Sequence, residues 1–178
     1  MFKKWSICIL MMAFICSLIG CRGHLRQDVM IFGEVHEYSN RSVKLSLTST
    51  LPKDSIIHIT LREIGSDNIV WEGNTTFTKD GFLTYEFKRP KINQEYKIEV
   101  LFEPTMQPAA IKEMYGESGE YIRDDSPGYH SYASTEKEMG RIIMYGVITG
   151  FKEETKDRGH HASSNLESDF ANLERMLD

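Results

Sequence analysis

Residues 95–102, EYKIEVLF, alternate polar and apolar side chains along their length. The apolar members Tyr96, Ile98, Val100 and Phe102 stand two residues apart, which is the repeat of a β-strand with one buried face. A helix would instead require apolar residues three and four positions apart. This stretch therefore predicts a half-buried strand, and the same pattern recurs on either side of it.

The period of two is found in most of the chain before residue 95 as well. It marks residues 29–35, 43–48, 57–62, 69–77 and 83–88, which are separated by turn-forming residues. Between the last two, Lys79-Asp80-Gly81 predicts a hairpin, because an Asp-Gly pair adopts positive φ at low cost. Residues 141–151 are apolar on both faces and predict a closing strand that is buried on both sides. Short antiparallel strands at this spacing indicate an all-β sandwich.

The strand spacing and the run at residues 95–100 resemble immunoglobulin-like and fibronectin type III-like domains over roughly residues 28–151. In such domains a tyrosine near the start of the sixth strand bonds back to the backbone at the corner before it, and Tyr96 stands at that place. The resemblance implies an immunoglobulin-like antiparallel β-sandwich of about seven strands. The chain departs from the antibody pattern because it has no cysteine pair and carries Trp71 on the fourth strand, which leaves the subtype open.

A second pattern lies at the N-terminus. Lys3 and Lys4 precede an uncharged apolar run over residues 5–19, which is the layout of a secretory signal. The run ends in Leu18-Ile19-Gly20-Cys21, which resembles the lipobox of bacterial lipoproteins. That resemblance implies cleavage between Gly20 and Cys21 and a diacylglyceryl group on the Cys21 sulfur. Residues 1–20 would then be a signal peptide and residues 21–27 a lipidated tether.

The other two cysteines of the run do not fit the lipobox, because Cys8 and Cys16 each follow a bulky isoleucine. Two alternatives stay open for the segment as a whole. An uncleaved transmembrane helix needs about 20 apolar residues, more than this run offers. An ordinary signal peptide would release a secreted protein with a spare thiol. The lipobox predicts a lipid-anchored protein on the extracytoplasmic side of a cell membrane, or in an outer membrane if the organism has one.

Composition limits the classes of partner. The 178 residues include 21 basic and 26 acidic ones, a net charge of −5, and the signal peptide contains two of the lysines and no acid. A mature charge of −7 argues against nucleic acid, which requires clustered Lys and Arg. The mature length suits one domain with a sizeable core. Because Cys21 is its only cysteine, no intrachain disulfide is expected.

A long insert, residues 105–139, separates the sixth strand from the closing strand. Within it Pro108 predicts the start of a short helix, Ala109 to Tyr115, which Gly116 would end. Tyrosines recur in this otherwise polar insert, at Tyr115, Tyr121, Tyr129 and Tyr132. Tyrosine is enriched at protein interfaces, so these four residues are candidates for contact with another protein. The alternative is that their rings pack over the sandwich and cover an open edge or end.

The C-terminus has two parts. Residues 152–163 are charged and predict a flexible linker. Ser164-Asn165-Leu166-Glu167 then fits a capping box, and Leu166, Phe170 and Leu173 share one helical face, so a short amphipathic helix is expected over residues 164–178. Its apolar face would fit a partner's groove, or it would dock on the chain's own domain. Its acidic residues argue against membrane binding.

No catalytic or metal-binding set can be assembled from the sequence. The run at residues 116–119, GESG, is one residue short of a nucleophile elbow. The histidines form no ligand pair at strand or helix spacing, although His36 and His58 would meet if their strands were neighbours. We expect no enzyme and no cofactor. The chain is predicted to be a non-catalytic, lipid-anchored envelope protein whose sandwich binds another envelope protein. The alternative is a solute- or metal-binding lipoprotein with a pocket between the insert and the sheet.

Overall fold

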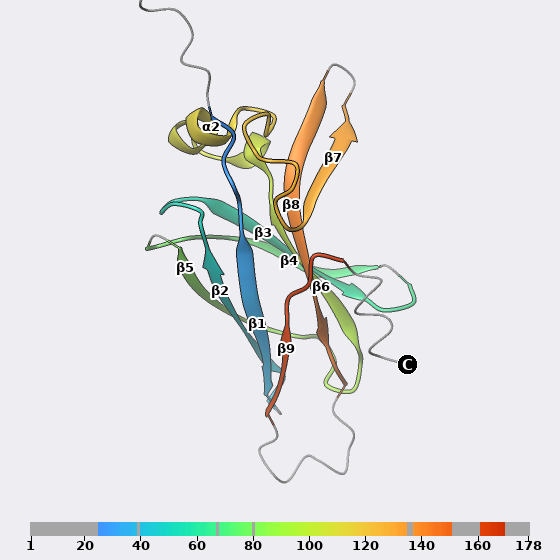
Figure 1. The fold of residues 1–178 in the computed structure, drawn as a ribbon. Coiled ribbons are helices and arrows are strands. Elements are labelled where there is room, and N and C mark those ends of the chain that lie inside the picture. Colours follow the sequence, from blue (N-terminus) through green and yellow to red (C-terminus); the bar gives the residue numbers. More distant parts are fainter. Residues whose placement is uncertain are drawn as a thin grey trace, which may run out of the picture.

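A computed structural model describes residues 25–38, 40–66, 68–79, 81–134, 137–150 and 161–169. Two antiparallel sheets pack face to face, as Figure 1 shows, so the expected all-β sandwich is confirmed. The strands expected from the sequence are all present. They are β1 (Ile31–Tyr38), β2 (Ser42–Ser49), β3 (Ile56–Glu63), β4 (Ile69–Thr76), β5 (Phe82–Lys88), β6 (Tyr96–Phe102) and β8 (Glu138–Ile148).

Two further strands were not anticipated, β7 (Tyr129–Ala133) in the insert and β9 (His161–Asn165) near the C-terminus. The four-stranded sheet has the order β5-β2-β1-β9, and the five-stranded sheet has the order β4-β3-β6-β8-β7. Every pair of neighbouring strands is antiparallel. Strands β2 and β3, like β4 and β5, follow one another in the chain but lie in opposite sheets.

The expected hairpin at Lys79-Asp80-Gly81 is therefore wrong. A tight turn does form there, with φ of 70° at Gly81 and a bridge between Lys79 and Phe82. The strands on its two sides nevertheless diverge, because β4 pairs with β3 and β5 pairs with β2. The Gly81 N–H donates to the Leu51 carbonyl at 3.2 Å. Because Leu51 follows β2, this bond holds the turn against the end of the four-stranded sheet.

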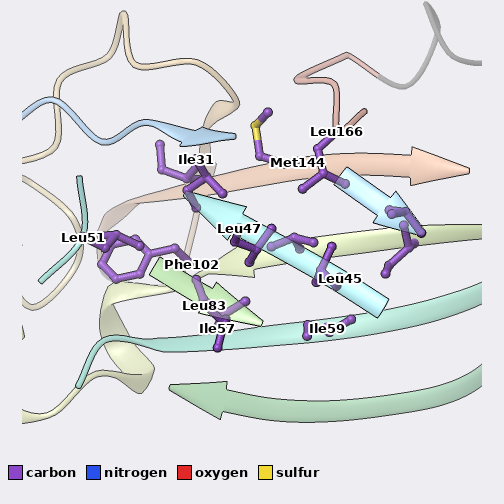
Figure 2. Packing of buried hydrophobic residues seen from close by; sticks show 14 of the residues in the cluster. Ile31, Leu45, Leu47, Leu51, Ile57, Ile59, Leu83, Phe102, Met144 and Leu166 are labelled. Carbon is purple, nitrogen blue, oxygen red and sulfur yellow. The ribbon is translucent and has the colours of Figure 1, made fainter. Parts of the chain in front are cut away.

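The core lies between the two sheets and is built by the alternation seen in the sequence. Figure 2 shows side chains of both sheets meeting there, among them Ile31, Leu45 and Leu47 from one sheet and Ile57 and Ile59 from the other. All five are fully buried. Because successive side chains of a strand point to opposite faces, the buried set fixes the register of each pair.

The corner between β5 and β6 contains the predicted tyrosine bond. The Tyr96 side chain is fully buried, and its hydroxyl accepts a hydrogen bond from the Lys91 N–H at 3.1 Å. The bond reaches five residues back along the chain, as the resemblance implied for this position. It fixes the path by which the chain enters the central strand of the five-stranded sheet.

A buried ion pair lies at the same end of the strands, beside this corner. Arg89 donates to the Glu37 carboxylate at 2.9 Å and to the Thr149 carbonyl at 2.6 Å, and both charged side chains are at most 1% exposed. Thr149 completes the arrangement by donating its N–H to Glu37 at 2.8 Å. Since Glu37 belongs to β1, Arg89 follows β5 and Thr149 follows β8, the group joins the two sheets.

The insert contains the helix expected from Pro108. The elements of the insert are η1 (Pro104–Met106), α2 (Ala109–Tyr115) and β7. Gly116 ends α2 with φ of 85°, a conformation that favours glycine, and its N–H donates to the Lys112 carbonyl. Pro108 was expected to open the helix and is its N-cap, one residue before Ala109.

The helix expected to begin at Ser164 is wrong in the described residues, and so is the linker expected to continue through residue 163. Residues 161–165 form β9, which pairs antiparallel with β1. The Ser164 hydroxyl donates to the Val147 carbonyl at 2.8 Å and does not cap a helix. Tertiary pairing with an open strand edge has overridden a local capping pattern. Residues 170–178, which include Phe170 and Leu173, lie outside the described residues, as do residues 151–160.

Candidate interaction surfaces

Tyr115 belongs to the core and is not available to a partner. Its side chain is 3% exposed, and its ring meets that of Phe102 edge-on, with centroids 5.3 Å apart. Burial raises the pKa of Tyr115 to about 12. Helix α2 therefore covers one end of the sandwich by inserting this ring together with Ile111.

The other tyrosines of the insert are partly buried and are bound to the domain. The Tyr132 hydroxyl donates to Glu103 at 3.2 Å, and the Arg141 guanidinium lies 4.5 Å from the centre of its ring. Tyr129 packs on the core over Gly140, where an added methyl group would lie 2.8 Å from the ring. Tyr121 is half-buried, and its backbone carbonyl accepts a hydrogen bond from Gln27. The structure thus favours packing of these rings over the sandwich, the alternative to an exposed tyrosine surface.

The turn after α2 surrounds the Glu120 carboxylate with hydrogen-bond donors. The Ser118 N–H and hydroxyl both donate to Glu120, at 2.9 and 2.8 Å, and Lys137 lies 3.3 Å from the other carboxylate oxygen. Desolvation acts to raise the pKa of Glu120, but hydrogen bonds from its own N–H, from Ser118 and from Lys137 together lower it to about 2. The Ser118 hydroxyl serves this turn as a donor.

Leu166, a candidate for a partner's groove, seals the seam between the two sheets. It is 7% exposed, and its N–H donates to the Gly33 carbonyl at 2.9 Å. A methyl group on Gly33 in β1 or on Gly146 in β8 would lie 2.9 Å from one of the two Leu166 methyl carbons. The two glycines, one from each sheet, therefore leave the space that this side chain fills.

An exposed apolar row, which was not predicted from the sequence, lies on the outer face of the four-stranded sheet. Thr48 pairs with Phe32 on one side and with Phe82 on the other, so the two rings flank it on neighbouring strands. Phe32 is 57% exposed and Phe82 is 53% exposed. The signal was present in the sequence, because both phenylalanines occupy the polar register of their strands.

An open groove of about 670 Å³ adjoins this row. Phe32 and Glu34 line it from β1, Pro127 from the insert, and Leu166 and Glu167 from the segment after β9. It thus lies between the insert and the four-stranded sheet, where a pocket was expected for the alternative, solute-binding function.

His36 and His58 do not converge. His36 lies on β1 and His58 on β3, so the two are on the outer faces of opposite sheets and cannot meet. His36 lies 3.2 Å from Glu34, and His58 is hydrogen-bonded to Asn74 at 2.7 Å. Within the part of the chain that the structure describes, no three His, Cys, Asp or Glu side chains are grouped so that they could hold a metal ion.

Gly20 and Cys21 lie outside the described residues. In the described part, no helix is long and apolar enough to span a bilayer. Comparison with protein-family models, with curated proteins and with solved structures finds no match.

Proposed function

We propose that this protein is a lipid-anchored, non-catalytic component of a bacterial envelope, and that its β-sandwich is an immunoglobulin-like module which binds another envelope protein. The lipobox-like residues 18–21 are the observation that carries this proposal, because they supply an acylated thiol directly before the domain. Two acyl chains on one sulfur would make the attachment stable, whereas a single chain binds only marginally.

The start of the domain supports a short attachment. Residue 27 is already tied to the insert, since its N–H donates to Tyr121 and its carbonyl accepts from Arg123. Six residue steps separate it from Cys21, a reach of about 20 Å at full extension. The insert end of the sandwich would thus stay near the bilayer.

The division of the strands supports the immunoglobulin-like assignment. Strands β1, β2 and β5 form one sheet and β3, β6 and β8 lie in the other, which matches strands A, B and E against C, F and G of the immunoglobulin fold. Strand β4 pairs with β3, whereas the corresponding strand of the constant type joins the first sheet. Strands β7 and β9 are additions. The bond of Tyr96 to Lys91 is the corner expected of this fold.

The exposed row of Phe32, Thr48 and Phe82 supports the binding of a protein. Aromatic side chains are enriched in the cores of protein interfaces, and here two lie more than half exposed on one flat sheet face. We assign the contact with the partner to this row, in place of the tyrosines of the insert.

Cell fractionation tests the anchor. Cys21→Ser should abolish cleavage of the signal peptide and partition into the detergent phase, while Cys16→Ser, a matched change within the apolar run, should alter neither. Unchanged processing and partition of the Cys21 variant would refute the lipid anchor.

Photo-crosslinking in native membranes tests the binding surface. A photoreactive residue at position 82 should capture one defined envelope protein, and the same residue at Glu86, four residues further along β5 on the same outer face, should capture much less of it. Equal capture from both positions, or none from position 82, would refute the assignment.

The groove beside the insert supports the second candidate function, a solute-binding lipoprotein. This alternative predicts saturable heat on titration of the protein with a small solute or metal, and loss of that heat in a Glu34→Gln variant. Absence of heat across common metals and solutes would remove it.

A further inference from the structure

Strand β5 forms one edge of the four-stranded sheet (Figure 1), and half of its backbone groups point away from its neighbour β2. The Arg89 N–H, directly after β5, donates to the Arg41 carbonyl beside β2 at 3.1 Å. In an antiparallel pair, residues that bond to the neighbour alternate with residues that do not. The N–H and C=O groups of Thr84, Glu86 and Lys88 therefore point to the side where the described sheet has no further strand.

The four edges of the two described sheets differ in how well they are protected against pairing with another chain. Strands β7 and β9 have only five residues each, and the pairing of β4 with β3 contains a register shift beside Leu61 and Arg62. Strand β5 keeps one register with β2 over all seven of its residues and contains no proline. Its inward side chains are uncharged, namely Leu83, Tyr85 and Phe87. Since short strands, bulges, prolines and inward charges are what prevent edge pairing, β5 is the least protected edge.

Aromatic rings line the open side of the sandwich next to this edge. Trp71 from β4 stacks on Phe87 from β5, with ring centroids 4.6 Å apart and planes 7° apart. Tyr85 lies 6.0 Å from the Trp71 ring, and both Trp71 and Tyr85 remain partly exposed. The inward side chains of a strand added to β5 would therefore meet apolar surface, whose removal from water favours association.

The sequence of β5 is complementary to itself when two copies run antiparallel. An axis of two-fold symmetry at Tyr85 places Thr84 opposite Glu86 of a second copy, and Phe82 opposite Lys88. These are the residues whose backbone groups point outward, so the two chains can exchange N–H and C=O bonds along the whole strand. An axis at Glu86 would instead set this carboxylate opposite its own copy, and like charges in that position repel.

The same axis brings apolar side chains together on the inner side, because Leu83 lies opposite Phe87 and Tyr85 opposite its own copy. We propose that two copies of this chain pair through the free edges of β5, antiparallel about an axis at Tyr85, and join their four-stranded sheets into one continuous sheet. Such an interface is isologous, the commonest kind in homodimers. It depends neither on the lipid anchor nor on the surface assigned to the partner protein.

The orientation of the dimer follows from the antiparallel pairing. The insert ends of the two copies point in opposite directions along the joined sheet. A dimer attached to a membrane through both tethers would therefore lie with its strands along the bilayer.

Sedimentation of the full-length chain, purified in detergent with Cys8, Cys16 and Cys21 changed to serine, tests the pairing across a series of concentrations. Thr84→Pro removes an outward N–H, and proline is tolerated on an edge strand at such a position. The variant should fold, and its dimer dissociation constant should rise at least about tenfold, because each dimer loses two donors. Thr84→Val is the matched control, since it keeps the N–H and a β-branched side chain, and should leave the dissociation constant unchanged.

Disulfide formation between two variants tests the register on the same cysteine-free background. A mixture of Thr84→Cys and Glu86→Cys proteins should form a disulfide-linked dimer on mild oxidation, because directly opposite residues have Cα atoms about 5.5 Å apart, within the range of a disulfide. Either protein alone should stay mostly reduced, since two copies of one position are offset by about 7 Å along the strands.

Three results would each overturn the proposal. The first is a chain that stays monomeric at every concentration. The second is an equal dissociation constant for Thr84→Pro and Thr84→Val. The third is a disulfide yield in the mixture no higher than in either protein alone, and this comparison decides by itself if Thr84→Pro loses its cooperative thermal unfolding.

Discussion

The seam that Leu166 fills between the two sheets provides the sharpest test of the fold. In Leu166→Ala the space between Gly33 and Gly146 would be left empty, because neither glycine has a side chain that could relax into it. Replacement of a buried leucine by alanine costs about 2–5 kcal/mol, depending on how far the site collapses. With Leu166 only 7% exposed and glycine on both sides, we expect a loss of about 3 kcal/mol in the free energy of unfolding.

The assay is denaturant unfolding of the purified protein, followed by tryptophan fluorescence. Ser168→Ala, an exposed position two residues further on, is the control and should change the free energy of unfolding by less than about 0.5 kcal/mol. A loss of less than about 1 kcal/mol in Leu166→Ala would contradict the packing at the seam.

A double mutant sharpens the test, because Gly146→Ala alone would place a methyl group 2.9 Å from Leu166, 2.8 Å from Ile98 and 3.1 Å from Val35. Overpacking of this kind costs about 1–3 kcal/mol. Leu166→Ala removes one of these clashes, so the double mutant should be more stable than the sum of the single effects predicts, by at least about 0.5 kcal/mol. Strict additivity would refute direct contact between residues 146 and 166.

Three further predictions concern polar groups. Glu37→Ala should lower the free energy of unfolding by about 3–5 kcal/mol, because it leaves the Arg89 charge buried without its carboxylate. Tyr96→Phe should cost about 1 kcal/mol, because the Lys91 N–H loses its acceptor while the ring stays packed. For Glu120 the folded pKa of about 2 lies below the ordinary value of 4.5, so its contribution to stability is fully present above pH 4.5 and is lost as the pH falls toward 2. Glu120→Gln should therefore be less stable than the unsubstituted protein near pH 6, and the difference should vanish near pH 2. All three are measured by equilibrium unfolding, the last across this pH range.

Each of these has an outcome that would count against it. If Glu37→Ala were as stable as the unsubstituted protein, the ion pair would not be holding the two sheets together. A Tyr96→Phe variant with unaltered stability would remove the role of the corner bond. A difference for Glu120→Gln that stayed constant from pH 6 to pH 2 would show that the carboxylate is not titrating in this range.

Local pattern was sufficient for seven strands and for helix α2. The period of two identified β1 to β6, because one buried face imposes alternation whatever the partner strand is, and an apolar run on both faces identified β8. Gly116 ended the helix as expected, because a positive φ there is a local requirement. Tyr96 was also identified in advance, since its bond spans only five residues.

The local sequence pattern gave wrong predictions where a segment distant in the chain supplied the contact. Ser164 and Glu167 satisfy a capping box, yet both pair as extended chain, Ser164 with Val35 on β1 and Glu167 with Tyr145 on β8. A helix this short is marginal without tertiary contacts, so pairing with distant strands prevails. The tyrosines of the insert were interpreted as contact residues for a partner. Their actual positions depend on how the insert packs over the end of the sandwich that α2 covers. Phe32 and Phe82 became neighbours only through Thr48, from a strand between them.

The sequence by itself determined that this chain forms a β-sandwich, where seven of the described strands lie and how the short helix ends, because side-chain patterning and turn chemistry act over a few residues. Tertiary structure alone decided which strands share a sheet, that Glu37 meets Arg89, and that Leu166 fills the space beside two glycines. The ion pair joins residues 52 positions apart and Leu166 lies 133 positions from Gly33, and no local pattern encodes such a pairing, because its stabilisation appears only once both sheets are assembled.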